Sequence, residues 1–283
     1  MTPGGIVPIA VLGLGIIGVR ATQRLIDAEW PVKSWNRTPK GHLTEVGSSA
    51  KAISGAAIIS IYLKDSFAVR EVMESLVNDF IPGQMILNHA TLDLETTLWL
   101  KGFFAARGCQ FLDAPFTGSK LAAESGQLLY YIGGDAQLAA EVDTYLAVSS
   151  RGRLYCGEVG SATVVKLATN LISACTVQAM AEALAITNHH GVASKCLLRA
   201  VSENASNSVL AEMKLPMMVA GNFETHFSLS NMAKDSRYMV ALAKSANLET
   251  PAIAAVSKRM SDLSAEGLGE LDFSAVAKPY QEK

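Results

Sequence analysis

The chain has 283 residues, of which 49% are hydrophobic and 18% charged, and its 24 basic and 26 acidic residues leave a formal net charge of −2. This length suits one large or two modest domains, and the balanced charge gives no reason to expect nucleic acid or an anionic membrane as a partner. The four cysteines form no CxxC pair and no HExxH motif is present, so neither a disulfide framework nor a metal site is predicted.

The first apolar run, residues 6–12, is followed by a glycine-rich turn and by an amphipathic stretch over residues 16–29. Strand, turn and helix are predicted in that order. The glycine spacing is that of a Rossmann turn, which brings the backbone close to a pyrophosphate at a helix N-terminus. We predict that the turn binds a dinucleotide; the alternative is a glycine-rich turn without a ligand. Its residues are Gly13, Leu14, Gly15, Ile16, Ile17 and Gly18.

A second strand-like run, residues 32–35, ends at Asn36, Arg37 and Thr38, and no carboxylate follows before Glu45. An NAD site usually has Asp or Glu here for the ribose 2′-hydroxyl, whereas an arginine suits a 2′-phosphate. Because Arg37 can bind a phosphate bidentately and Thr38 can add a hydroxyl, NADP(H) is favoured over NAD(H). The alternative is that Arg37 is a solvated loop cation.

Strand-like and helical patterns then alternate through the first half of the chain. The runs at 58–62, 85–88, 110–112 and 128–132 are separated by helical patterns at 67–77, 94–106 and 136–148. This alternation predicts a doubly wound, mostly parallel α/β sheet. It stops near residues 157–161, and helices with turns at Gly191, Pro216, Gly221 and Pro251 follow. We expect an N-terminal NADP-binding Rossmann domain at 1–160 and an all-α C-terminal domain for substrate binding and dimerisation at 161–283.

Residues 167–187 are apolar over nearly the length of a membrane span, but Asn170, Gln178 and Glu182 interrupt them. A helix buried on most sides is the better interpretation. We therefore expect a soluble, cytoplasmic protein.

The segment Asp113–Ser119 follows a predicted strand. Thr117, Gly118 and Ser119 can present a hydroxyl and consecutive backbone amides to a carboxylate, as in an anion-binding nest. The alternative is a Pro/Gly turn without a ligand.

Lys166 and Asn170 are spaced i, i+4 and share one face of a predicted helix. A lysine in so apolar a helix needs polar company or solvent. Next to a nicotinamide it can donate a proton to a carbonyl oxygen, with Asn170 holding the lysine or the substrate. The alternative is a lysine that reaches solvent.

Taken in order, these segments resemble the β-hydroxyacid dehydrogenase family, the 3-hydroxyisobutyrate dehydrogenase-like enzymes, and within it the glyoxylate and succinic semialdehyde reductases. The resemblance covers nearly the whole chain. It rests on the glycine turn, residues 35–38, 118–120 with 124–128, Lys166 to Asn170, Lys234-Asp235 and residues 267–276.

The resemblance implies a role for each matching residue. Lys166 is expected as the general acid and Asn170 as support for the substrate. Substrate contacts are implied for Thr117, Gly118, Ser119, Phe227 and Asp235, and nicotinamide-side contacts for Thr91 and Lys234. A homodimer or homotetramer is also implied.

Three departures from the family pattern bear on substrate and cofactor. Thr117 replaces the usual serine, Asn88-His89-Ala90-Thr91 replaces an Asp-x-Ser-Thr pattern, and the stretch 38–57 is shorter than in relatives. The sequence predicts an NADPH-dependent reductase of small aldehyde acids, glyoxylate and succinic semialdehyde first. The alternatives are a 3-hydroxyisobutyrate dehydrogenase or tartronate semialdehyde reductase, and, less favoured, an imine reductase or a catalytically silent nucleotide-binding protein.

Overall fold

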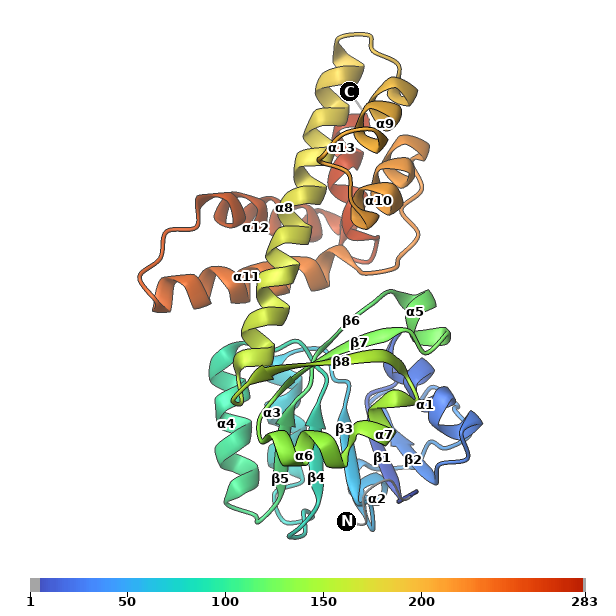
Figure 1. The fold of residues 1–283 in the computed structure, drawn as a ribbon, viewed down its shortest axis with the longest axis vertical. Helices are drawn as coiled ribbons and strands as arrows, with labels where there is room; N and C mark the ends of the chain where they lie inside the picture. Colours follow the sequence, from blue (N-terminus) through green and yellow to red (C-terminus); the bar gives the residue numbers. More distant parts are fainter. Residues whose placement is uncertain (1–5, 282–283) are drawn as a thin grey trace. The chain divides into compact units, whose positions relative to one another are not determined.

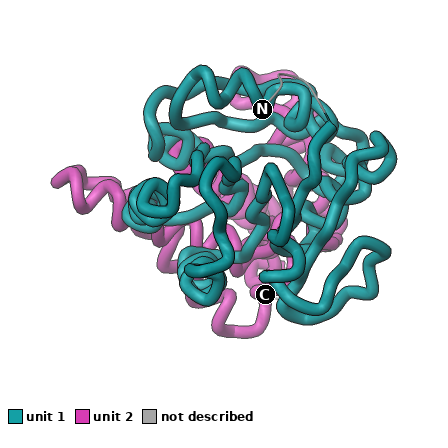
Figure 2. Tube along the Cα trace, turned by 90° about the horizontal axis from the view of Figure 1, so that it is seen from below, with its two compact units in different colours: residues 1–166 teal, residues 167–283 magenta. Residues whose placement is uncertain are grey.

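The structure is a computed structural model that describes residues 6–281 (Figure 1). The chain divides into two compact units, Met1–Lys166 and Leu167–Lys283, which Figure 2 colours separately. The division falls inside a 29-residue helix, α8 (Ser161–His189), whereas the boundary expected at residue 160 precedes that helix.

The first unit is built on an eight-stranded sheet with the order β2-β1-β3-β4-β5-β7-β6, and β8 pairs with β7. Strands β1 to β5 pair in parallel, β7 is antiparallel to β5 and β6, and β8 is parallel to β7. The predicted mostly parallel Rossmann-like sheet is confirmed. The strands are β1 (Ile9–Leu12), β2 (Val32–Trp35), β3 (Ile58–Ile61), β4 (Met85–Asn88), β5 (Gln110–Asp113), β6 (Phe116–Thr117), β7 (Leu128–Gly133) and β8 (Ser150–Gly157).

The central strands β1, β3 and β4 are buried on both faces. Successive residues of a strand point to opposite sides of the sheet, so each of these strands contributes to two apolar layers. In β1, Ile9 and Val11 belong to one apolar cluster, and Ala10 and Leu12 belong to another. The helices of this unit are α1 (Gly18–Asp27), α2 (Ser49–Ile53), α3 (Ser66–Ser75), α4 (Leu94–Ala105), α5 (Lys120–Glu124), α6 (Ala136–Glu141) and α7 (Asp143–Ala147).

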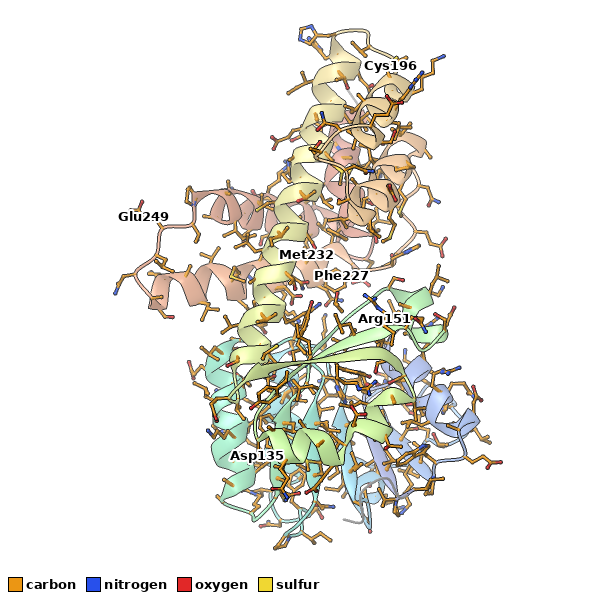
Figure 3. All side chains as sticks on the ribbon, in the orientation of Figure 1. Asp135, Arg151, Cys196, Phe227, Met232 and Glu249 are labelled. Atoms are coloured by element: carbon orange, nitrogen blue, oxygen red, sulfur yellow. The ribbon has the colours of Figure 1, made fainter. Side chains whose placement is uncertain are left out.

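Aspartates fix where three of these helices begin. The carboxylates of Asp65, Asp93 and Asp135 accept hydrogen bonds from backbone amides in the first turns of α3, α4 and α6. Asp135 is labelled in Figure 3. An N-cap carboxylate satisfies amides that have no partner within the helix, so these residues set the helix starts.

The structure corrects three predictions of local structure. The helix expected over 136–148 is two helices, interrupted at Val142 (φ −96°, ψ 4°). Strand β8 was missed because it is largely solvent-exposed and carries glycine and arginine instead of an apolar pattern. The turn expected at Pro216 is wrong, since Pro216 lies within α10, where the buried neighbours Leu215 and Met218 pack into the core.

The second unit is helical and has one apolar core, to which α8, α10, α11 and α12 all contribute. The predicted helical C-terminal domain is confirmed. Besides the C-terminal part of α8 it contains α9 (Ser194–Ser202), α10 (Val209–Ala220), α11 (Leu229–Ser245), α12 (Pro251–Leu263) and α13 (Lys278–Gln281), with a π-helical turn at Ser264–Leu268 and a 3-10 turn at Phe273–Ala277.

Among the described residues, α8 is the one helix long and apolar enough to cross a membrane. Its buried residues Leu167, Ala174, Val177 and Leu184 contribute to the core of the second unit. Core helices of proteins that do not span a membrane can have the same length and composition, so these two properties do not show that α8 crosses a membrane.

Candidate functional site

The glycine-rich turn lies between the end of β1 and the start of α1. Gly13 has φ +108°, and a Cβ atom there would lie 2.5 Å from the carbonyl oxygen of Tyr62. A Cβ atom on Gly18 would lie 2.1 Å from the carbonyl oxygen of Gly13. Two of the three glycines are therefore required by close packing of strand and helix.

Gly15 is different, because a Cβ atom there would meet no described atom within 4 Å beyond its chain neighbours. Its carbonyl accepts a hydrogen bond from Val19 N at 3.1 Å, so the first amides of α1 follow Gly15 directly. Around Gly15 the turn is open, with Leu14 buried and Ile16 exposed. An open backbone before a helix N-terminus fits the pyrophosphate of a dinucleotide, which residues 13–18 would hold.

The end of β2 is tied to this turn through Asn36. Its Oδ1 accepts from Leu14 N at 2.9 Å, and its Nδ2 donates to the Thr38 carbonyl at 2.6 Å. Arg37 points to α3, where its Nη1 lies 3.1 Å from Glu71 Oε2, and the two side chains are 70% and 52% exposed. Asn36 therefore fixes the turn, while Arg37 stands in solvent with a weakly held partner.

The short segment after Thr38 folds back along β2. Ser34 N donates to the Thr44 carbonyl and Val46 N to the Ser34 carbonyl, each at 2.9 Å. The carboxylate of Glu45 accepts from the amides of Lys40 and His42 at 2.9 and 3.3 Å. Glu45 thus closes its own loop, which is a different task from binding a ribose hydroxyl.

The ends of β3 and β4 carry a buried polar network around His89. Its Nδ1 lies 2.7 Å from the Ala114 carbonyl, so this nitrogen carries the proton; Nε2 then accepts from Ser60 Oγ at 3.1 Å. Ser60 Oγ lies 2.6 Å from Tyr145 OH, and the His89 ring stacks on Tyr62 with centroids 4.5 Å apart. A neutral imidazole satisfies every contact of this network.

Burial lowers the pKa of His89 to about 4, against a hydrogen bond to Ala114 that raises it. A histidine in the unfolded chain has a pKa near 6.5, so between about pH 6.5 and 4 the unfolded chain binds a proton that the folded chain does not bind. Stability due to His89 is therefore complete above about pH 6.5 and falls as the pH drops toward 4.

We expect His89→Gln to have a lower free energy of unfolding than the parent protein at pH 7.5. At pH 4.5 the difference between the two proteins should be smaller by about 2 to 3 kcal/mol, because the parent loses the contribution of the neutral His89. Urea unfolding at the two pH values measures the change. His190→Gln, at an exposed histidine, serves as the matched control. A pH-independent difference for His89→Gln would contradict the buried neutral state.

Asp113, at the end of β5, holds the start of α8. Its oxygens accept from Thr163 N at 2.8 Å and Thr163 Oγ1 at 2.9 Å. Burial raises the pKa of Asp113 to about 6, although hydrogen bonds from Thr163 and Gly160 lower it. A raised carboxyl pKa stabilises the fold below about pH 4 and loses this effect as the pH rises through 6. Because this trend opposes that of His89, the His89 variant comparison is needed to separate them.

Thr91 follows β4 in a loop fixed by Asn88. Asn88 Nδ2 donates to the Ala90 carbonyl at 3.0 Å, and Asn88 Oδ1 accepts from Ala90 N at 3.3 Å. Asn88 is fully buried, whereas Thr91 is partly exposed. The amide side chain thus shapes the loop that presents Thr91.

The segment Thr117–Ser119 runs from β6 into α5. Gly118 has φ +141°, and a Cβ atom there would lie 2.7 Å from Leu128 Cδ2. Ser119 is extended (φ −84°, ψ 175°), and its Oγ accepts from Ala122 N at 3.3 Å. Thr117 lies in strand β6 and Gly118 has φ +141°, so this backbone differs from the αR–αL pair of a nest. Binding of a carboxylate by Thr117, Gly118 and Ser119 stays a prediction. As an acceptor in the cap, the Ser119 hydroxyl keeps its proton for donation elsewhere, and Thr117 is partly exposed.

Lys166 and Asn170 both lie on α8, one turn apart, and both are 9% exposed. Asn170 Nδ2 donates to Asp235 Oδ2 on α11 at 2.7 Å. Lys234 Nζ lies 3.1 Å from Asp235 Oδ1, and its side chain is 12% exposed. Asp235 therefore orients Asn170. The substrate contact that the family resemblance implies for Asp235 stays a prediction.

Phe227, labelled in Figure 3 just before α11, is held through its backbone. Its amide donates to Asp272 Oδ2 at 3.1 Å, and its ring meets that of Phe273 edge to face. Lys214 Nζ lies 2.8 Å from both oxygens of Asp272, and the two side chains are buried. Burial opposes the charge on Asp272, but the Lys214 ammonium still lowers the pKa of this carboxyl.

Sequence reasoning missed the residues that position the predicted ones. Asp113, Asp235 as an orienting group, and the pair of Lys214 and Asp272 are buried charges in apolar surroundings. An isolated charge in an apolar pattern is a usable signal that a polar partner exists, but the sequence does not identify that partner. In the described part of the chain, no group of three or more His, Cys, Asp or Glu side chains is arranged to hold a metal ion.

The sheet and the glycine-rich turn are those of an NAD(P)-binding Rossmann-like domain, and with the helical domain the chain matches NAD(P)-dependent oxidoreductases. Residues 8–160 match the family model for the NAD-binding domain of 6-phosphogluconate dehydrogenase, and residues 160–280 match that for NAD-binding of NADP-dependent 3-hydroxyisobutyrate dehydrogenase. The chain belongs to the β-hydroxyacid dehydrogenase family, of the 3-hydroxyisobutyrate dehydrogenase type. The family resemblance predicted from the motifs is confirmed.

Two curated relatives come from Arabidopsis thaliana. The chain is 30% identical to glyoxylate/succinic semialdehyde reductase 2, chloroplastic, over 96% of this chain and 79% of that protein. It is also 30% identical to glyoxylate/succinic semialdehyde reductase 1, over 95% and 96% of the two chains. A 3-hydroxyisobutyrate dehydrogenase from Mycobacterium tuberculosis, solved with L-serine, has the same fold, with a TM-score of 0.89 at 20% identity over 97% of this chain and 99% of that one.

Proposed function

We propose that this protein reduces a small aldehyde acid, glyoxylate or succinic semialdehyde, to the hydroxy acid with NADPH. The observation that carries the proposal is 30% identity, over nearly the whole of both chains, to a glyoxylate/succinic semialdehyde reductase. The presence of Lys166 and Asn170 on one helix supports a reductase over a catalytically silent nucleotide-binding protein.

Bound NADPH would supply the hydride that reaches the carbonyl carbon. We assign to Lys166 the proton that the carbonyl oxygen takes up in the same step, and to Asn170, held by Asp235, the orientation of the substrate or of the lysine. Thr117 and Ser119 would donate hydroxyl hydrogen bonds to the substrate carboxylate. A carboxylate fixed in this way presents the carbonyl in one orientation, which is a large part of the rate gain.

NADPH preference rests on Arg37. The Arg37–Glu71 pair is exposed, so its stability contribution is small and a phosphate with nearly two charges can compete for the guanidinium. Closure of the loop by the Glu45 carboxylate also supports a site without a ribose-binding acid.

We expect Arg37→Ala to reduce the preference for NADPH by about ten- to a hundredfold, because it removes a charge-assisted contact worth about 1.5 to 3 kcal/mol. Glu71→Gln should increase the preference, since the guanidinium loses its competing partner. The measurement is kcat/KM with NADPH and with NADH. Lys33→Ala, which removes a charge of β2 that donates to the Ser54 carbonyl, is the matched control. Equal use of both cofactors by the parent protein contradicts the assignment.

A substrate panel tests the function itself. Reduction is assayed with glyoxylate, succinic semialdehyde and tartronate semialdehyde, and oxidation with 3-hydroxyisobutyrate. Each assay is run with the NADP and the NAD form of the cofactor. We expect the highest kcat/KM with NADPH and one of the first two aldehydes. A clear preference for 3-hydroxyisobutyrate or tartronate semialdehyde selects the second candidate. The absence of turnover with all four contradicts the proposal and leaves the imine reductase and the silent nucleotide-binding protein, which a cyclic imine as a fifth substrate distinguishes.

We further propose a cytoplasmic homodimer or homotetramer with a small carboxylate-bearing substrate and without nucleic acid or membrane partners. The near-neutral net charge supports the second part. Exposed apolar residues on α8, namely Val164, Ile172 and Ile186, support self-association. Sedimentation at several protein concentrations measures the oligomeric state.

A further inference from the structure

One arginine of α1 contacts two segments that are far apart in the sequence. Arg20 Nη1 donates to the Ile16 carbonyl of the glycine-rich turn at 2.6 Å. Arg20 Nε donates to Glu124 Oε1, the last residue of α5, at 2.7 Å. A single guanidinium therefore bridges the glycine-rich turn and α5, the helix that Ser119 caps.

Helix α5 is short enough to transmit a displacement from one end to the other. Glu124 lies five residues after Ser119, which is about one and a half helical turns. Ser119 caps the helix through Ala122 N, and Gly118 packs tightly against Leu128. Glu124 and the capping Ser119 hydroxyl therefore lie at the two ends of one short helix.

A second contact, one turn later on α1, supports the first. Arg24 Nε donates to the Val148 carbonyl at 3.3 Å, and a Cβ atom on Gly126 would lie 3.1 Å from Arg24 Nη2. Helix α1 therefore contacts both the end of α5 and the turn after it. The Arg20 side chain is 22% exposed and that of Glu124 45%, so the ion pair is only partly screened by water.

We propose that Arg20 and Glu124 are positioning residues that couple the dinucleotide turn to the substrate loop Thr117–Ser119. This inference rests on the proposed function, because it takes these two segments as the cofactor and substrate sites. Binding of the dinucleotide at residues 13–18 fixes the Ile16 carbonyl and with it Arg20. Arg20 in turn fixes Glu124, so α5 and Ser119 are ordered before the aldehyde acid binds. Coupling of this kind makes bound NADPH raise the affinity for the aldehyde acid, and by reciprocity the aldehyde acid raises the affinity for NADPH by the same factor.

Hydrogen–deuterium exchange of the segment 119–127, with and without NADPH, tests the coupling without any turnover. In the parent protein we expect NADPH to slow exchange of this segment about fivefold or more. Glu124→Gln removes the ion pair but keeps the contact between Arg20 and Ile16, and it should reduce that slowing to less than about twofold. Asp143→Asn is the matched control, because the Asp143–Arg153 pair has the same 2.7 Å distance and similar exposure but joins α7 to β8.

Kinetics separates positioning from a merely structural role. With saturating NADPH, Glu124→Gln should raise KM for succinic semialdehyde about three- to tenfold with kcat changed less than about twofold. Arg20→Met should also weaken NADPH binding, measured by nicotinamide fluorescence, because the Ile16 contact is lost. The double variant Arg20→Met/Glu124→Gln should have the KM of Arg20→Met alone, since both changes break the same pair.

The coupling is overturned if NADPH does not slow exchange of residues 119–127 in the parent protein. It is also overturned if Glu124→Gln retains the full slowing, or if Asp143→Asn reduces the slowing as much as Glu124→Gln does. It is also overturned if Glu124→Gln lowers kcat and leaves KM unchanged. If NADPH slows exchange of residues 119–127 but the protein reduces none of the aldehyde acids, the coupling is supported and the proposed function is contradicted. The two failures are therefore distinguishable.

Discussion

Replacing Lys166 with alanine is expected to slow aldehyde reduction about 10²- to 10⁴-fold, the usual range for removal of a positioned acid. Lys166 is buried on α8, one turn before Asn170, whose amide is fixed by Asp235. The affinity for NADPH should be retained, because the proposed dinucleotide site is the glycine-rich turn at residues 13–18, which does not include Lys166. Single-turnover oxidation of NADPH gives the rate, and fluorescence gives the NADPH affinity separately.

Lys166→Arg distinguishes proton donation from attraction of the substrate carboxylate. A guanidinium keeps the positive charge but gives up its proton too reluctantly near neutral pH, so the arginine variant should stay slow. Lys258→Ala, at a lysine that is 79% exposed on α12, is the control for loss of a positive charge. If the arginine variant keeps most of the rate, or if the alanine variant loses NADPH binding in proportion to its activity, Lys166 is not the acid.

The substrate is expected to require a carboxylate, so butanal should have a kcat/KM at least about a hundredfold below that of succinic semialdehyde. Two charge-assisted hydrogen bonds of about 1.5 kcal/mol each, from Thr117 and Ser119, account for a loss of this size. Without the anchor the carbonyl is also free to rotate, which lowers the rate further. Initial rates with both aldehydes at saturating NADPH measure the ratio.

Thr117→Val assigns this effect to the loop. The variant keeps the shape of the side chain and its place in β6 while removing the hydroxyl. It should lower kcat/KM for succinic semialdehyde by about tenfold and leave butanal unchanged. If the parent protein has the same kcat/KM for the two aldehydes, or if Thr117→Val lowers both values equally, Thr117–Ser119 is not the carboxylate site.

Much of the fold was predictable because its signals are local. The apolar run of β1, the glycine spacing after it and the helix that follows depend on residues within a few positions of one another. Strand β8 and the place of Pro216 inside α10 were not predictable, because packing against distant residues outweighs their weak local preferences. In the same way, the extended torsions of Ser119 follow from its role as the cap of α5, which the sequence 117–119 does not show.

By itself the sequence determined which chemical groups are present and which of them are neighbours along one element. Lys166 and Asn170 share a helix face because they are four residues apart, and Arg37 follows β2 because the strand ends there. Only the tertiary structure decided the partners: Asp235 for Asn170 and Glu124 for Arg20, which are 65 and 104 residues away. The reason is physical. A side-chain hydrogen bond needs its atoms within about 3 Å, and over such separations that distance is fixed by the packing of whole helices and sheets, which no local pattern specifies.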